Sequence, residues 1–262
     1  MLSYPSAISL STRSLNHLAD LIRARRKGLR SRWRRLSAGR QALLALAHLR
    51  NGDTPTQLAA GFEVGATTAW RYIREAVDLL AATPPTLAQA MASIARLAYA
   101  ILDGTLIRID RLGGSANRRY YAGKARHHAV NVQVIADCAG RLKWVSPALP
   151  GSTHDLTAAR VHGIIDTLAE AGVMTFADKG YQGAGGTVRT PHKRHHPRPP
   201  LSRNQKAVNR SHAKIRGIGE RANATLKTWK VLTRLHCCPQ RATALLNAIF
   251  VLQLAEEQRK SG

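Results

Sequence analysis

Three acidic residues stand apart in a chain that is poor in acid: Asp103 in ILDGT, Asp178 in FADKGYQG and Glu220 in RGIGERANATLK. Between positions 179 and 219 there is no Asp or Glu, although Lys, Arg and His are frequent there. A single carboxylate in such a cationic stretch is either an isolated surface residue or a metal ligand whose charge the ion balances. Carboxylate oxygens are ligands that Mg²⁺ prefers in proteins. The three positions are therefore candidates for one metal site.

The residues around Glu220 have helical spacing. Arg216 lies one turn before it and Lys227 two turns after it, so at about 100° per residue all three share one helix face. A carboxylate between two cations could bind a metal ion while the cations hold phosphates on either side of a scissile bond. The same spacing also suits a surface ion-pair ladder, worth only a few tenths of a kcal/mol. The company of Asp103 and Asp178 favours the first arrangement.

The composition favours a nucleic-acid partner. Forty Lys and Arg against 15 Asp and Glu give a formal net charge of +25, and such a charge is most readily neutralised by phosphates. A ribosomal-type protein or an arginine-rich genome background would give a similar balance. Hydrophobic residues make up 44% of the chain, as in globular proteins. Aromatic residues make up only 5%, which argues against a single-strand binder built on stacking platforms.

Cysteine content and hydropathy bear on the compartment. The three cysteines include an adjacent pair, which does not suit a disulfide framework and favours a reducing cytoplasm. The longest apolar run, Leu245 to Ala255, is too short to span a membrane. We therefore expect a cytoplasmic protein without membrane contact.

The segment from about Leu15 to Leu80 is predicted to be helical. Ser37 can cap the helix that contains ALLALAHL. A short helix ending at Ala60, a turn at Gly61 and a second helix from Thr67 to Leu80 form a helix-turn-helix pattern. The second helix of such a unit enters the major groove with its first turns. An ordinary helical hairpin is the alternative. The candidate DNA-binding residues on this second helix are Thr67, Thr68, Arg71 and Arg74.

From Tyr99 onward the pattern changes to strands. Segments 99–109, 128–137 and 142–149 alternate in the manner of an antiparallel meander. A capped helix over 151–172 and a buried strand over 173–178 then predict an α/β sheet with a right-handed crossover. Asp103 and Asp178 fall at strand ends, where functional residues collect. Residues 180–203 are predicted to be loop. A helix is predicted over 202–229, and an apolar final helix over 242–258 should pack on the sheet.

The order of these motifs resembles the DDE transposases of bacterial insertion sequences, in the group that includes harbinger-type endonucleases. The matching pieces are the helix-turn-helix region, LDGT, GSTHD, ADKGYQG and the R-x3-E-x6-K spacing. The resemblance implies an α/β RNase H-like catalytic domain, a mixed sheet with flanking helices, preceded by a small all-α helix-turn-helix domain. We accordingly assign residues 1–82 to the DNA-binding domain, 83–97 to a linker and 98–262 to the catalytic domain.

The resemblance also implies a function. Asp103, Asp178 and Glu220 would be the catalytic triad and would hold two Mg²⁺ ions, with Mn²⁺ as a substitute, about 3.5–4 Å apart. The reaction would be strand cleavage at the element ends, followed by strand transfer to target DNA. The partners would be terminal inverted repeats and target DNA, with Arg216 and Lys227 on the phosphates. A homodimer would assemble on the DNA ends, in the bacterial cytoplasm at the nucleoid. A decayed remnant or a non-catalytic DNA-binding protein is the alternative.

Other side chains offer competing sites. Asp155 lies in GSTHD, but it opens a predicted helix and can act as a cap, so Asp178 is preferred as the second acid. Tyr181 could indicate a tyrosine recombinase, but the Arg and His partners of that class are not organised around it. Zinc is disfavoured because no C-x2-C pair exists and the histidines lie in a proline-broken basic loop that suits DNA phosphates. The zinc candidates are His192, His195, His196, Cys237 and Cys238.

Overall fold

We describe a computed structural model of the chain, covering residues 8–30, 34–110, 113–114, 116–194, 199–236 and 238–257. The chain divides into two compact units. One comprises Met1–Pro84 together with Lys227–Gly262, and the other comprises Pro85–Leu226. The expected boundaries differ from this division, because the C-terminal segment groups with the N-terminal helices.

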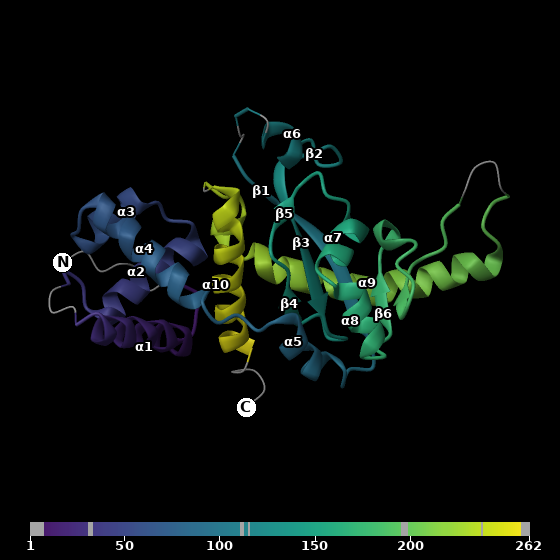
Figure 1. Ribbon diagram of the computed structural model, residues 1–262, viewed down its shortest axis with the longest axis horizontal. Coiled ribbons are helices and arrows are strands. Elements are labelled where there is room, and N and C mark those ends of the chain that lie inside the picture. The colour runs from purple at the N-terminus through teal and green to yellow at the C-terminus, as the bar shows by residue number, and fades with distance from the viewer. Residues whose placement is uncertain are drawn as a thin grey trace. The chain divides into compact units, whose positions relative to one another are not determined.

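The first unit is helical (Figure 1). Its first helices match the expected ones, and Ser37 caps α2 by accepting a hydrogen bond from the backbone of Arg40. The elements are α1 (Thr12–Gly28), α2 (Ala38–Asn51), α3 (Pro55–Phe62), α4 (Ala66–Leu80), the 3₁₀ turn η2 (Lys230–Leu232) and α10 (Pro239–Glu257).

Helices α3 and α4 form the predicted helix-turn-helix. Thr54 and Gln57 make a reciprocal capping box at the start of α3, which satisfies two backbone donors. The turn lies at Glu63 rather than at the expected Gly61. Glu63 adopts a left-handed conformation with φ of 56°, and its N–H reaches back to carbonyls of the last turn of α3. Helix α3 therefore extends to Phe62, which is buried in the core of this unit.

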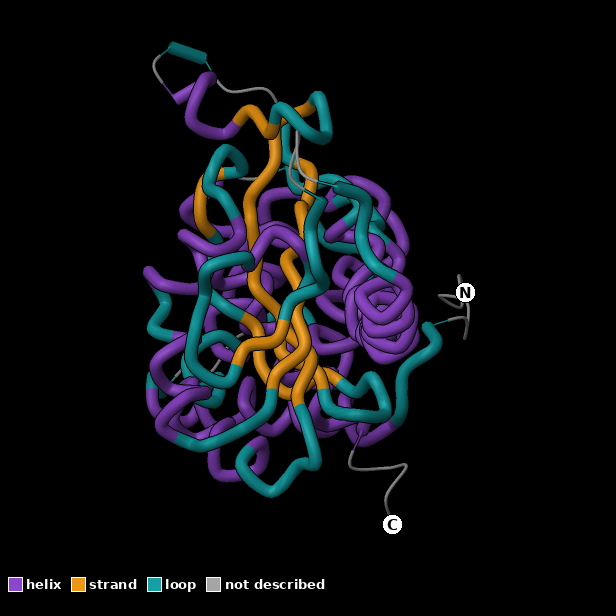
Figure 2. Tube along the Cα trace, turned by 90° about the vertical axis from the view of Figure 1, so that its right-hand side faces the viewer, coloured by secondary structure: helices purple, strands orange, loops and turns teal. Residues whose placement is uncertain are grey.

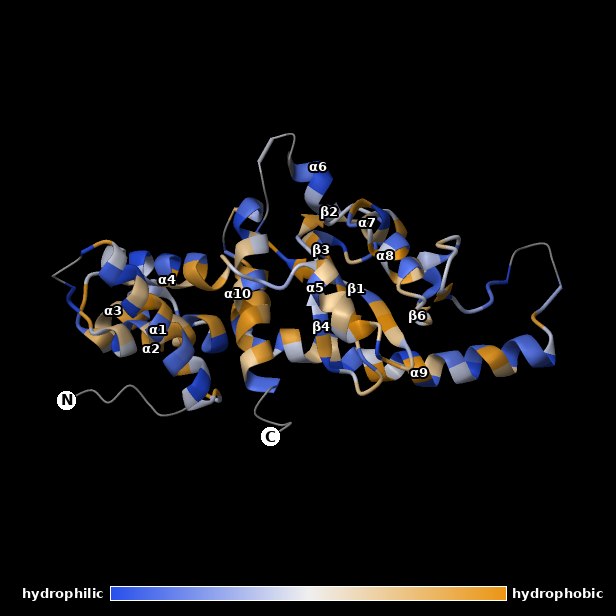
Figure 3. Cartoon of the chain, turned by 60° about the horizontal axis from the view of Figure 1, so that its bottom comes forward, coloured by the Kyte–Doolittle hydropathy of each residue, from blue (hydrophilic) through white to orange (hydrophobic). Residues whose placement is uncertain are grey.

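The final helix does not pack as expected. Instead of covering the sheet, α10 contacts α4 and α1 within the helical unit. Figure 3 shows that most residues along α10 are hydrophobic, and such a helix needs apolar neighbours on several sides. Polar contacts fix its two ends, from Arg241 to Asp78 at 3.1 Å and from Glu256 to the hydroxyls of Ser11 and Ser14.

The second unit contains a mixed sheet (Figure 2). The strand order is β2-β3-β1-β6-β7, with β4 and β5 also pairing with β3. β1 is antiparallel to β3 and parallel to β6, which confirms the predicted meander and crossover. The strands are β1 (Ala100–Arg108), β2 (Tyr121–Ala122), β3 (His127–Ala136), β4 (Leu142–Val145), β5 (Leu149–Pro150), β6 (Thr175–Ala177) and β7 (Val188–Arg189).

Helices cover both faces of this sheet. α7 (Asp155–Val161) and α8 (Ile164–Glu170) lie on one face, and α9 (Arg203–Lys227) crosses the other (Figure 1). The single helix expected over 151–172 is divided at Gly163, whose φ of 65° is left-handed. The expected linker 83–97 contains α5 (Leu87–Ile94), which packs on β4 and α8. The unit also contains α6 (Ala116–Tyr120) and the 3₁₀ turn η1 (Lys179–Tyr181).

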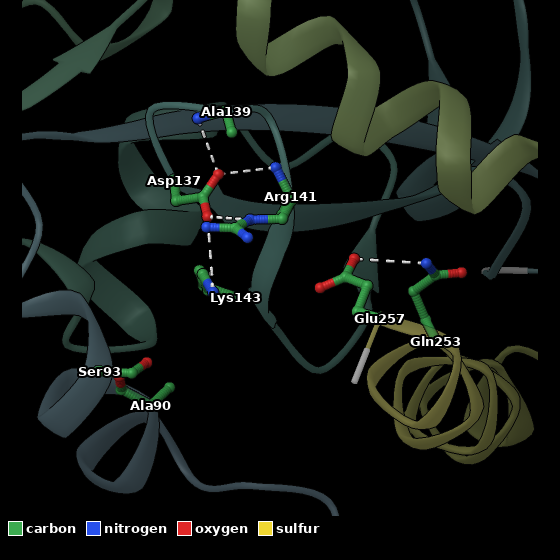
Figure 4. A network of polar contacts seen from close by, with 8 residues as sticks. All are labelled: Ala90, Ser93, Asp137, Ala139, Arg141, Lys143, Gln253 and Glu257. Carbon is green, nitrogen blue, oxygen red and sulfur yellow. Dashed lines mark hydrogen bonds and ion pairs between the residues drawn. The ribbon is translucent and has the colours of Figure 1, made fainter. Parts of the chain in front are cut away.

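A buried acid stabilises the turn between β3 and β4 (Figure 4). The backbone N–H groups of Ala139 and Arg141 each donate to Asp137 Oδ1 at 2.9 Å, and Arg141 Nε donates to Oδ2 at 2.7 Å. Lys143 Nζ lies 3.5 Å from the same carboxylate. Burial alone would raise the pKa of Asp137, but these hydrogen bonds and charges outweigh it and lower the pKa. This acid is therefore structural.

No helix in the described part of the chain is both long enough and apolar enough to cross a membrane.

Candidate active site

Asp103 and Asp178 are carried by neighbouring parallel strands. Leu102 of β1 and Ala177 of β6 are register partners, so the two aspartates are the next residues along each strand. Adjacent strands lie about 4.8 Å apart, which brings the two carboxylates into electrostatic contact. The two acids are therefore neighbours, as expected. The prediction that Asp103 ends its strand is wrong, because β1 continues to Arg108 in pairing with β3, whereas Asp178 does follow the end of β6.

Asp103 is held by one residue from the sheet and one from α9. Its Oδ1 accepts a hydrogen bond from Gly104 N at 3.0 Å, and its Oδ2 accepts one from Asn223 Nδ2 at 2.8 Å. Burial, together with the negative charges of Asp178 and Asp155 and against the opposing charge of Arg216, raises the pKa of Asp103 to about 6. A cation bound nearby would stabilise the ionised carboxylate and so lower this raised pKa.

Asp178 begins the 3₁₀ turn η1. Its Oδ1 accepts a hydrogen bond from Gly180 N at 2.7 Å, which fixes the carboxylate at the end of β6. Tyr181 in the same turn is fully buried, and its hydroxyl donates to Gln133 Oε1. Burial, followed by the charges of the nearby aspartates, raises the pKa of Tyr181 well above its usual value. Because the hydroxyl is fully buried and hydrogen-bonded to Gln133, it is not accessible to a DNA strand in this structure, which argues against a recombinase nucleophile at Tyr181.

Asp155 does not cap a helix, contrary to the interpretation from sequence. The N-cap residue of α7 is His154, and the Asp155 carboxylate instead turns toward the sheet. Asn131 Nδ2 donates to Asp155 Oδ1 at 2.8 Å, and Gln133 Nε2 lies 3.5 Å from the same oxygen. The sequence does contain a sign of this arrangement. Asn131 and Gln133 place two amides on one face of an otherwise apolar strand, which indicates a polar partner on that face.

Glu220 lies on α9 with its side chain exposed. Helix α9 approaches the sheet closely through Gly219, where an added Cβ would lie 2.6 Å from Ile101 Cγ2. Within the described residues Glu220 forms no ion pair with Arg216, so the alternative of a surface ion-pair ladder is not observed. Asn223 is the residue of α9 that contacts Asp103. The structure therefore brings two of the three expected acids together and leaves the third on the adjoining helix.

The donor chemistry of this region suits a hard divalent cation. Asp103, Asp178 and Asp155 supply carboxylate oxygens, the ligand type that Mg²⁺ and Mn²⁺ prefer. Their mutual repulsion would be relieved by a cation. Across the described ranges, however, no three His, Cys, Asp or Glu side chains are already arranged as a closed metal site. This also holds for the zinc candidates His192 and Cys238, whereas His195, His196 and Cys237 lie outside the described residues.

The expected DNA-reading residues lie on α4. Thr67, Arg71 and Arg74 are exposed, and Thr68 is half-buried. Sequence reasoning missed Trp70, which is 48% exposed on the same face and stacks under the Arg74 guanidinium at 5.3 Å. Arg74 also lies 3.9 Å from Asp78. Because a large exposed aromatic side chain is rarely favourable on a free surface, this helix face has the character of a binding surface.

Comparison with known families agrees with this geometry. The family described as DDE superfamily endonuclease matches residues 102–253, more than half of the chain. The helix-turn-helix of DDE superfamily endonuclease matches residues 34–86, which contain α2, α3 and α4. The chain therefore belongs to the DDE superfamily of endonucleases, which are DNA-cleaving enzymes that depend on divalent metal ions.

Within that superfamily the chain belongs with the transposases of insertion sequences. It is 31% identical over 194 residues to the "Putative transposase for insertion sequence element IS112" of Streptomyces albus G. The alignment covers 73% of this chain and 70% of the relative. The resemblance inferred from sequence motifs is thereby confirmed.

Proposed function

We propose that this transposase cleaves DNA strands at the ends of its own element and transfers them to target DNA by a mechanism that uses two Mg²⁺ ions. The observation that supports this most directly is the pairing of Leu102 with Ala177, which sets Asp103 and Asp178 side by side at one sheet edge. Both aspartates lie inside the segment that matches the endonuclease family.

The residues that would hold the cations are Asp103, Asp178 and Glu220. When bound, the ions supply Lewis acidity for an in-line displacement at phosphorus. In cleavage, an oxygen of water forms a bond to phosphorus while the P–O3′ bond breaks, which leaves a 3′-hydroxyl and a 5′-phosphate. In strand transfer, that 3′-hydroxyl attacks a target phosphodiester and displaces a new 3′-hydroxyl. Glu220 would join the two aspartates through adjustment of α9 or of its own exposed side chain when DNA binds.

Arg216 and Lys227 are proposed to contact the phosphates of the substrate. The Arg216 charge already acts on Asp103, where it opposes the rise in pKa. A guanidinium in that position can form paired hydrogen bonds with a phosphate. Lys227 is exposed at the end of α9, where its ammonium group is available to a DNA phosphate as a point charge.

The helix-turn-helix is proposed to bind the terminal inverted repeats. Thr67, Thr68, Arg71 and Arg74 would enter the major groove from the first turns of α4. A homodimer assembled on two ends would hold both substrates for the coupled reactions. The place of action would be the nucleoid in the bacterial cytoplasm, where the high positive charge finds its polyanion.

Cleavage assays with the full chain test this function. The substrate is DNA that carries the sequences flanking the gene, with Mg²⁺, with Mn²⁺ or with EDTA. We expect strand cleavage only with a divalent ion, and its loss in Asp103→Asn and Asp178→Asn while DNA binding is retained. Metal-independent cleavage, or normal cleavage by either variant, would overturn the proposal.

A further inference from the structure

The two faces of strand β1 carry different parts of the site. Successive residues of a strand point to opposite faces. Asp103 accepts a hydrogen bond from Asn223, so its face of the strand lies against α9. Gly104 lies on the other face, opposite Gln133 of β3, and this is the face that α7 covers (Figure 1). A residue at the start of α7 therefore approaches the paired aspartates from behind the strand.

The carboxylate of Asp155 occupies the space that a side chain at position 104 would need. A Cβ atom on Gly104 would lie 2.7 Å from Asp155 Cγ, far closer than the about 3.5–4.0 Å separation of carbon atoms in contact. On the neighbouring turn, a Cβ atom on Gly180 would lie 3.3 Å from Asp155 Oδ2 and 2.8 Å from Asp178 Oδ1. The glycines in DGT and DKGY thus both leave room for the same third carboxylate.

Buried amides hold Asp155 in this orientation. Oδ1 accepts the hydrogen bond from Asn131, and Gln133 bridges Asn131 and Tyr181 through contacts of its own amide. Asn131 is 3% exposed, whereas Gln133 and Tyr181 are fully buried. Such a satisfied buried network gives its members a single arrangement. With Oδ1 engaged in this way, Oδ2 is the oxygen nearer to the Gly180 turn.

We propose that Asp155 is a positioning residue of the nuclease site. It acts from behind β1 in two ways. Its packing against Gly104 and Gly180 fixes strand β1 beside Asp103 and the turn η1 that follows Asp178, and its charge adds to the negative potential that attracts the divalent ion. The inference deepens the proposed function and rests on it, because it concerns the same cation.

A role at the start of a helix does not account for these contacts. An acid in the first turn of a helix contributes about 0.3–1 kcal/mol through the helix dipole, and α7 has only seven residues. That role requires neither two glycines at van der Waals contact nor two buried amides. Asp166, an exposed acid in the first turn of α8, has only that role and offers a matched control.

Binding of Mn²⁺ to the full chain without DNA, followed by electron paramagnetic resonance, tests the proposal. We expect Asp155→Asn to weaken Mn²⁺ binding by about 10- to 100-fold, the range seen when outer partners of metal ligands are removed. Asp166→Asn should bind Mn²⁺ like the wild type. The metal-free Asp155→Asn protein should unfold at the wild-type temperature or above, because the amide keeps the shape and removes repulsion between acids.

The outcomes separate the two proposals. If Asp103→Asn and Asp178→Asn lose Mn²⁺ while Asp155→Asn retains it, the role of Asp155 is refuted and the proposed function stands. If all three variants bind Mn²⁺ like the wild type, the cation is not held at this site and the proposed function fails.

A second pair of variants tests the packing independently of the charge. Gly104→Ala should lower both stability and Mn²⁺ affinity, because its Cβ collides with the Asp155 carboxylate. Adding Asp155→Ala should restore the stability but not the Mn²⁺ affinity, since space is regained and charge is lost. If the second change restores no stability, Asp155 does not occupy the space beside Gly104 and the proposal is overturned.

Discussion

Asn223 on α9 donates a 2.8 Å hydrogen bond to Asp103 Oδ2, so an amide of this helix, and not the expected Glu220 carboxylate, contacts Asp103 of β1. Three residues correspond to a rotation of about 300°, so Glu220 points about 60° away from Asn223 around the axis of α9. Asn223 is half-buried near the face that packs on the sheet through Gly219, whereas Glu220 is exposed. Helix α9 thus contacts Asp103 through Asn223, while Glu220 stays exposed on the same helix.

Replacement of Glu220 by Gln should abolish cleavage and leave DNA binding intact. The side chain is exposed and forms no ion pair within the described residues, so the amide should not disturb folding. Loss of a ligand that stabilises charge in the transition state should slow cleavage by at least about 100-fold, as for other preorganised groups. Single-turnover cleavage and gel-shift titration measure the two effects. Glu170→Gln, an exposed acid at the end of α8, is the control, and equal cleavage by both variants would remove Glu220 from the site.

The raised pKa of Asp103 predicts a pH-dependent cost in the metal-free protein. Above pH 6 the carboxylate is ionised at a buried position, which destabilises the folded state. The cost disappears as the pH falls through the folded pKa of about 6 toward the unfolded value of 3.8. In EDTA, the difference in unfolding free energy between Asp103→Asn and the wild type should therefore grow in favour of the variant as the pH rises from 4 to 7. The total change should be about 2–3 kcal/mol. Urea unfolding at several pH values measures this difference, and a constant difference would show that the pKa is not raised.

Much of the fold could be predicted because its signals are local. Caps such as Ser37 and Thr54 mark helix starts, and period-two alternation marks β1 and β3. The proximity of Asp103 and Asp178 was predicted from parallel neighbouring strands, although only Asp178 follows a strand end. Asp103 lies within β1 at the point where its pairing with the shorter β6 stops. The two-residue strands β2, β5 and β7 could not be found, because so short a segment has no measurable period.

The missed parts of the site depend on tertiary contacts. Asp155 has the sequence context of a helix cap, and only the burial of Asn131 and Gln133 turns its carboxylate to the sheet. The packing of α10 was misjudged for a related reason. Hydropathy shows that a helix is apolar but does not identify which surface, here that of α4 and α1, covers it.

Removal of the Tyr181 hydroxyl should destabilise the catalytic unit. The Gln133 side chain is fully buried, and its Oε1 accepts a hydrogen bond from the Tyr181 hydroxyl. Tyr181→Phe leaves that oxygen unsatisfied at a cost of about 1–3 kcal/mol. Thermal and urea unfolding measure the loss, with Tyr121→Phe as an exposed control. A wild-type unfolding free energy for Tyr181→Phe would indicate that the network behind Asp155 is not formed.

Arg71 and Lys206 should differ in how they affect DNA binding. Arg71 is exposed on α4, whereas Lys206 is exposed on α9 in the basic segment. If Arg71 contacts base edges, Arg71→Ala should cost about 1–3 kcal/mol on the cognate repeat and little on other DNA. Lys206→Ala should weaken binding to all sequences and reduce the salt slope by about 1. Titrations on cognate and scrambled DNA at several salt concentrations measure both, and a uniform loss from Arg71→Ala would exclude base readout by that residue.

Trp70 should contribute to DNA affinity without contributing to folding. Its ring is 48% exposed and stacks with Arg74 on the face of α4 that also carries Arg71. A surface side chain away from the core changes stability by no more than about 0.5 kcal/mol when replaced, so Trp70→Ala should fold normally. It should weaken binding to the cognate repeat, because the ring both supplies apolar contact and orients the Arg74 guanidinium.

A double-mutant cycle of Trp70→Ala with Arg74→Ala should give non-additive losses in binding, since the two side chains touch. Additive losses would mean that the stacked pair does not act as a unit on DNA.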